Sequence, residues 1–149
     1  HLRIQLDSPY LLWSEQAHLI AVGEHLPLKV RQITEIAAMV HDIGIHKAEK
    51  SFHTTAGKIQ EKLGAPESVK LLRDMGFSDE IVNRVSYLVG HHHTYTGIDG
   101  IDYQIIVEAD FLVNIYEDNM DLQARENAFG NIFKTSTGKR LFRQMYPIE

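Results

Sequence analysis

Apolar and polar positions along this chain follow the spacing of helices rather than that of strands. Between residues 103 and 117, apolar residues recur three or four positions apart, as on one face of a helix. No stretch alternates with a period of two for long enough to predict a strand. We therefore predict an all-α, compact multi-helix bundle with about seven or eight helices. The stripe of the 103–117 helix comprises Ile105, Ile106, Ala109, Leu112, Val113 and Tyr116.

Turn and capping residues divide the rest of the pattern into helices. We expect a first helix over 10–24, a short turn at 25–27, and a second helix that ends in His41 and Asp42. Helices joined so tightly should run antiparallel. Gly64 is predicted to end a helix over 54–63, Pro66 to open the next and Gly76 to close it. Ser78 caps another helix, and weaker patterns predict helices near 122–133 and 139–145.

Composition narrows the class of protein. A chain of 149 residues is expected to form one domain over residues 1–149. It has no cysteine, no apolar run long enough to span a membrane and no signal peptide pattern, so we expect a cytoplasmic protein. The formal net charge of −5 argues against binding to nucleic acid or to an anionic membrane. Nine residues are histidines, six of them between positions 41 and 93, which directs attention to metal chemistry.

The most informative stretch is an apolar helix that ends in His41-Asp42-Ile43-Gly44. An imidazole and a carboxylate at the buried end of a helix are costly unless they are paired. A divalent metal ion would satisfy both, because imidazole nitrogen and carboxylate oxygen bind such ions together. A lone His-Asp pair at a helix end more often faces solvent, so the argument depends on the other residues of the chain.

Three further residues fit the same hypothesis. Asp110 lies within the apolar stripe of its helix, where a buried salt bridge and a metal ligand are equally good explanations. His92 precedes it by 18 residues, at the end of the preceding helix, and belongs to the run His91-His92-His93. His53 stands just before a predicted helix, where it could equally cap that helix or face solvent. Together with His41 and Asp42, these residues form a joint pattern that chance explains poorly.

In this order and spacing, the motifs resemble the HD-domain metal-dependent phosphohydrolase superfamily over residues 28–119. The resemblance depends on His41-Asp42-Ile43-Gly44, on His53 before Thr54-Thr55-Ala56-Gly57, on the histidine cluster and on Glu108-Ala109-Asp110. It implies an all-α bundle of the HD-domain type that binds one or two divalent metal ions. It also implies hydrolysis of a small phosphate ester, most often of a nucleotide.

The resemblance also implies a role for each matching residue. His41, Asp42 and Asp110 would hold a first metal ion, and Asp42 would bridge to a second ion held by His53 and His92. His91 is the next candidate ligand. Asp42, His53 and His92 would also be the catalytic residues, through a metal-activated water. The mixed ligand set favours Fe or Mn, with Mg, Zn or Ni as alternatives.

Two features depart from the pattern of the superfamily. Lysine usually follows the His-Asp-Ile-Gly motif, but here Ile45 stands there and Lys47 is the nearest basic residue, so the phosphate contact of that lysine cannot be assigned. Lys47, Lys58 or another histidine of the cluster could stabilise the leaving group. The superfamily also has a histidine on the preceding helix. His18 is the obvious counterpart, but an antiparallel partner of His41 should lie near positions 9–13, so His18 would be displaced along the helix by about 8–12 Å.

The sequence thus predicts a metal-dependent phosphoric ester hydrolase. Two alternatives remain open. A non-catalytic domain of the same type could bind a nucleotide or a protein partner, which the absent first histidine favours. A diiron oxygenase could use the same scaffold. The sequence leaves the substrate, the metal and the oligomeric state undetermined.

Overall fold

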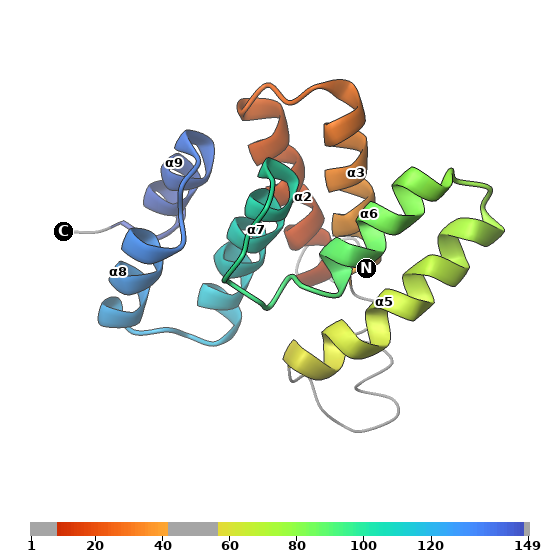
Figure 1. Cartoon of the computed structure of the whole chain (residues 1–149). Coiled ribbons are helices and arrows are strands. Elements are labelled where there is room, and N and C mark those ends of the chain that lie inside the picture. Colours follow the sequence, from red (N-terminus) through yellow and green to blue (C-terminus); the bar gives the residue numbers. More distant parts are fainter. Residues whose placement is uncertain (1–8, 42–56, 148–149) are drawn as a thin grey trace, which may run out of the picture.

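The computed structural model describes residues 9–41 and 57–147, with only the backbone described for residues 9–13 and 117. This part of the chain forms a packed bundle of seven α-helices and contains no strand, which confirms the predicted all-α class (Figure 1). The helices are α2 (Pro9–Gly23), α3 (Leu28–Val40), α5 (Gly57–Asp74), α6 (Asp79–Val89), α7 (Ile101–Glu117), α8 (Leu122–Asn131) and α9 (Ser136–Met145).

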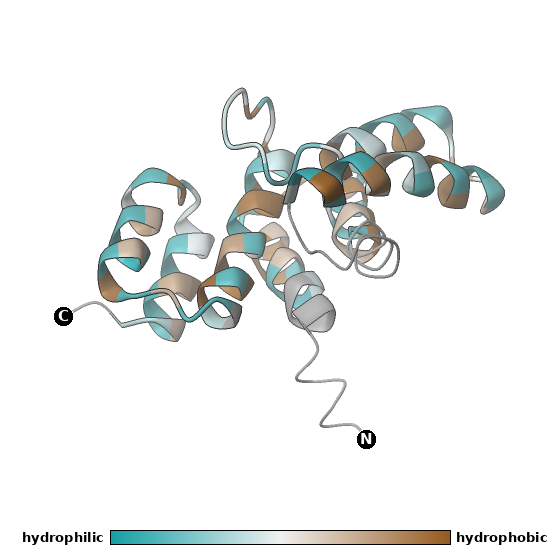
Figure 2. Cartoon of the chain, turned by 90° about the horizontal axis from the view of Figure 1, so that it is seen from below, coloured by the Kyte–Doolittle hydropathy of each residue, from teal (hydrophilic) through white to brown (hydrophobic). Residues whose placement is uncertain are grey.

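Helix α7 lies at the centre of the bundle. It packs against α2, α3 and α9, while α5 and α6 pack on one another and α6 also contacts α3 (Figure 1). The predicted stripe is buried from Ile105 to Val113, but Tyr116 is 71% exposed, so its inclusion was wrong. In the last turn of the helix, Ile115 is the buried residue and the neighbouring Tyr116 faces outward. Teal and brown positions alternate along the helices, as expected of amphipathic helices (Figure 2).

Helix α5 corrects the prediction of two helices separated at Gly64. One continuous helix passes through both Gly64 and Pro66. Its buried positions, from Gln60 and Glu61 through Gly64 and Ser68 to Leu72, continue at a four-residue spacing across the expected break. Tertiary packing of this face against α6 therefore outweighs the local preference of glycine and proline to end a helix.

The start of α6, the end of α5 and the turn between α2 and α3 lie where the capping and turn residues of the sequence predict them. The Ser78 side chain accepts a hydrogen bond from the Ile81 amide at the start of α6. Gly76 has a φ of +84° just beyond α5, a conformation that favours glycine, and its amide donates to the Arg73 carbonyl. The turn between α2 and α3 contains His25 with a φ of +56°. These features confirm the predicted turns.

Two carboxylates hold the start of α9, one of them fully buried. Glu108, fully buried on α7, accepts hydrogen bonds from the Lys134 and Thr135 amides, the Thr135 hydroxyl and the Gln104 side chain. Glu24, just after α2, accepts from the amide and hydroxyl of Thr137. Carboxylates are favourable at a helix N-terminus, where backbone amides lack partners within the helix. These contacts connect the C-terminal helix to both α2 and α7.

None of the helices in the described part of the chain has the length and apolar character needed to cross a membrane.

Candidate metal centre

Two buried histidines occupy the ends of two neighbouring helices. His41 is the residue that caps α3, and His92 follows α6. Their side chains are 3% and 0% exposed, and their ring centroids lie 5.7 Å apart at an interplanar angle of 87°. Packing of α3 against α6 therefore brings together two residues that are 51 positions apart in the sequence.

The backbone fixes the tautomer of both rings in the same way. His41 Nδ1 lies 3.0 Å from the Ala38 carbonyl oxygen, and His92 Nδ1 lies 2.7 Å from that of Val89. A carbonyl oxygen can only accept, so each Nδ1 carries a proton, and Nε2 is the nitrogen that holds the lone pair when the ring is neutral. Metal-binding histidines commonly donate their other ring nitrogen to a carbonyl or a carboxylate. Both rings are thus arranged as Nε2 donors to a cation.

Burial also keeps His92 in the form that binds metals. Desolvation lowers the pKa of His92 well below its ordinary value, and repulsion from His93 and His41 lowers it further. The ring is consequently neutral near pH 7, and only a neutral imidazole offers a lone pair to a metal ion.

Asp110 reaches the same region from α7. It is buried at 4% exposure, and Asn114 donates to its Oδ2 over 3.1 Å. The Nδ1 atom of His93 lies 3.5 Å from the same oxygen. His93 is itself packed on His92, with ring centroids 4.1 Å apart. The sequence-predicted residues His41, His92 and Asp110 therefore lie in one contiguous polar cluster.

His93 is a member of this cluster that the sequence interpretation did not select. Its Nε2 lies 2.7 Å from Gln60 Oε1, and its backbone amide donates to Glu61 Oε2 over 3.0 Å. Burial lowers the pKa of His93, although the Glu61 carboxylate opposes the shift. The signal was present in the run of three histidines, but the pattern alone could not tell which members face inward.

Gly57 explains how His93 fits beside α5. A Cβ atom at position 57 would lie only 2.7 Å from His93 Cγ, so a larger residue would displace the imidazole. Glu61 then fixes the turn that follows α6, because it also accepts from the Thr94 hydroxyl and pairs with Lys58 over 3.2 Å. The start of α5 is thus shaped to receive the histidine run.

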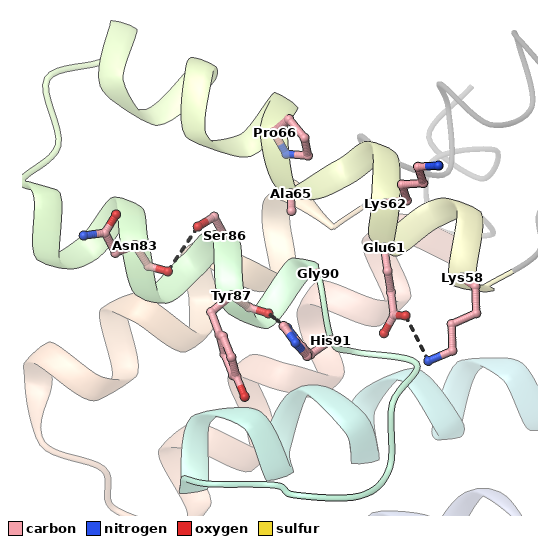
Figure 3. A pocket seen from close by; sticks show the side chains of 10 residues that line it. All are labelled: Lys58, Glu61, Lys62, Ala65, Pro66, Asn83, Ser86, Tyr87, Gly90 and His91. Carbon is pink, nitrogen blue, oxygen red and sulfur yellow. Dashed lines mark hydrogen bonds and ion pairs between the residues drawn. The ribbon is translucent and has the colours of Figure 1, made fainter.

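His91 points to a different neighbourhood from that of His92. Its ring stacks on Tyr87 with centroids 4.0 Å apart, and its Nδ1 lies 2.7 Å from the Tyr87 carbonyl oxygen. It lines a groove between α5 and α6 (Figure 3). The described contacts therefore join His91 to Tyr87 rather than to the cluster of His41, His92 and Asp110.

His18 is held away from the end of α3. Its Nδ1 contacts Glu35 on the exposed side of the α2–α3 pair, while Ser14 donates to the Ala38 carbonyl. Extending this antiparallel register by one turn places residues 11 and 12 opposite His41. Six residues separate Glu35 from His41, which corresponds to about 9 Å along the helix. This register agrees with the predicted displacement of His18.

The remaining predicted residues, Asp42 and His53, lie outside the described part of the chain, as do Ile45 and Lys47. Within residues 9–41 and 57–147, no group of three or more His, Asp or Glu side chains is arranged to hold a metal ion by itself. His41, His92 and Asp110 are buried and could form part of a larger donor set. Their donor types, two imidazole nitrogens and a carboxylate, suit a divalent transition metal.

Comparison of the chain with protein-family models, curated proteins and solved structures found no match.

Proposed function

We propose that this protein is a metal-dependent phosphoric ester hydrolase whose substrate is a small phosphate ester such as a nucleotide. The observation that carries the proposal is that His41 and His92, just beyond α3 and α6, lie with Asp110 of α7 in one buried polar cluster that is linked through His93. All three are buried, and both imidazoles have the Nδ1–H···O=C arrangement that directs Nε2 toward a cation. A solvated helix end would have none of these properties.

The proposed site requires ligands beyond the described residues. Asp42 follows His41 directly in the sequence, and His53 is the second candidate. With these two, the donor set would suit one or two divalent ions, and the combination of imidazole and carboxylate favours Fe or Mn. Bound divalent ions would supply polarisation of the phosphoryl oxygens and a water of lowered pKa.

The chain's own residues would orient this chemistry. The Ala38 and Val89 carbonyls hold the imidazoles of His41 and His92 in one tautomer. Asn114 and His93 flank the Asp110 carboxylate and restrict its rotation. Burial excludes bulk water from these groups and strengthens their interaction with a charged ligand. Lys58 pairs with Glu61 and donates to Thr94, the residue that follows the histidine run.

The test compares metal content and hydrolysis in matched variants. Protein purified without chelator or nickel resin is incubated with Mn²⁺ or Fe²⁺, desalted and analysed for metal. It is then assayed with p-nitrophenyl phosphate and bis(p-nitrophenyl) phosphate. We expect Asp110→Ala and His92→Gln to weaken metal binding by at least about 10–100-fold and to abolish hydrolysis.

His18→Gln is the matched control, since it removes an exposed histidine that pairs with Glu35. It should retain both metal and activity. Folded wild-type protein that takes up neither metal, or hydrolysis that persists in metal-free Asp110→Ala, would refute the proposal.

A non-catalytic binding domain is the second candidate. The observation that favours it is the α2–α3 register, which places residues 11 and 12, both leucines, opposite His41. Under this alternative, nucleotides would raise the melting temperature without being hydrolysed, and added Mn²⁺ would make no difference to that shift.

A further inference from the structure

The groove between α5 and α6 is a second region with binding chemistry. It is an open cavity of about 650 Å³, within the range of about 300–1,000 Å³ common for small-molecule sites. Its residues come from the first half of α5 and the second half of α6, which face one another across it (Figure 3). None of His41, His92 and Asp110 is among the residues that line it.

Small residues form the floor of the groove. Ala65 and Gly90 meet there, and a Cβ at position 90 would lie 3.3 Å from that of Ala65 and 3.2 Å from the Ser86 carbonyl oxygen. Gly90 has a φ of −75°, which any residue adopts, so glycine contributes space at this position rather than conformational freedom. The result is a shallow apolar surface.

One wall of the groove is a rigid aromatic pair. The rings of Tyr87 and His91 stack at 21°, and the bond from His91 Nδ1 to the Tyr87 carbonyl fixes the imidazole. The Arg84 guanidinium lies over the Tyr87 ring at 5.2 Å and restrains it further. Since His91 and Arg84 cover the Tyr87 ring, a planar aromatic ligand would pack against the His91 side of this preformed pair, at little conformational cost.

The opposite rim carries cations and the α6 side carries polar groups. Lys58 and Lys62 are one helical turn apart on α5. Lys58 is balanced by Glu61, whereas Lys62 is exposed and has no ion-pair partner within the residues that the structure describes. Asn83 and Ser86 supply amide and hydroxyl groups across the groove. The excess positive charge suits a phosphate.

We propose that the α5–α6 groove is a binding site for a nucleoside phosphate, with the base against the Tyr87–His91 pair and the phosphates at Lys62. This site is distinct from the candidate metal centre and does not depend on the proposed hydrolysis. The two regions adjoin through the turn after α6, where His91 faces the groove and His92 and His93 face the cluster.

The experiment measures ADP binding to metal-free protein in EDTA. Its result therefore does not depend on whether the protein is a metal-dependent hydrolase. Binding is measured by calorimetry and mapped by backbone amide shifts. We expect shifts concentrated in residues 58–66 and 83–91, and we expect Lys62→Gln to weaken ADP binding about 3–10-fold. The matched control Lys70→Gln removes an exposed lysine of the same helix outside the groove and should change the affinity by less than about twofold.

Adenosine and inorganic phosphate, used separately, test the two halves of the site. Each should bind more weakly than ADP, and Tyr87→Leu should weaken adenosine and ADP but leave phosphate unaffected, provided that circular dichroism shows it folded. The proposal is overturned if millimolar ADP causes no shifts, if shifts cluster around His41 and Asp110 instead, if phosphate alone matches ADP, or if the two lysine variants lose affinity equally.

Discussion

Gly138 shows how closely individual residues are fitted around the buried Glu108 carboxylate. A Cβ at position 138 would lie 1.8 Å from Glu108 Oε1 and 2.7 Å from the Thr135 hydroxyl oxygen. The carboxylate cannot yield easily, because backbone amides and the Thr135 hydroxyl all donate to it.

We therefore predict that Gly138→Ala lowers the free energy of unfolding by about 2–4 kcal/mol. Urea denaturation measures the change. Gly130→Ala on α8 is the control, since a Cβ there meets nothing and the substitution should be neutral or stabilise by up to about 1 kcal/mol. Equal effects of the two changes would contradict the predicted clash.

Tyr103 connects α7 to the turn after α6. Its hydroxyl lies 2.9 Å from the His91 carbonyl oxygen and 2.5 Å from that of Thr94. Burial raises the pKa of Tyr103 to about 12, and the neighbouring Tyr87 adds to the shift. Since the folded pKa is above the unfolded value of about 10, the folded state holds this proton more tightly.

The contribution of Tyr103 to stability is consequently complete below pH 10 and is lost as the pH rises toward about 12. We predict that Tyr103→Phe costs about 1 kcal/mol at pH 7, from the lost hydrogen bond, and that this difference shrinks at pH 11. Urea titrations of both proteins at the two pH values provide the test. A difference that is independent of pH would exclude the assigned titration.

Among the elements, α5 contains the clearest conflict between local sequence and packing. Pro66 lies inside the helix, where it removes one backbone hydrogen bond and crowds the preceding turn. We predict that Pro66→Ala raises the free energy of unfolding by about 1–2 kcal/mol, less than the full helix penalty because proline also restricts the unfolded chain.

The control for this change is Pro27→Ala, at the N-cap of α3, where a missing amide proton costs nothing within the helix. Its effect should stay within about 0.5 kcal/mol. A loss of stability in Pro66→Ala would mean that the proline itself contributes to packing.

Most of the element order could be predicted because the apolar stripes and caps agree with the final packing. The caps at Ser78 and Gly76 are local signals, so the sequence is sufficient to place them. The continuity of α5 depends on a buried face against α6, and no local signal reports that contact. The sequence therefore predicts a break at Gly64 and Pro66, whereas the structure has one continuous helix α5.

The candidate site was predictable in part for the same reason. Asp110 lies within an apolar stripe, and His41 and His92 follow apolar helices, so burial of all three could be expected. The direction of each residue in the His91-His92-His93 run depends on how the chain leaves α6, which is set by contacts of Glu61 and Tyr103 from other helices. The hydrophobic periodicity applies only within the helix, so it cannot predict the direction of the three histidine side chains that follow α6.

At the scale of the whole molecule, a metal ion at the candidate centre would cross-link α3, α6 and α7, which also meet through the ion pairs Lys29–Glu80 and Arg84–Asp102. A ligand that binds the folded state alone stabilises it by mass action. We predict that Mn²⁺ at about 100 times its dissociation constant raises the free energy of unfolding by about 2.7 kcal/mol.

The stabilisation should disappear with EDTA and in Asp110→Ala, and should persist in His18→Gln, as measured by thermal denaturation. Stabilisation of the same size in Asp110→Ala would place the ion elsewhere on the protein.

The contacts of Glu24 with Thr137 join residues that are 113 positions apart. On a ribosome, α2 emerges well before α9, whose first turn donates to Glu24. These contacts cannot form until α9 is available, and loop closure over such a distance slows folding. A chain released before α9 would expose Glu108 and the apolar face beside it, which is the kind of surface that chaperones and proteases recognise.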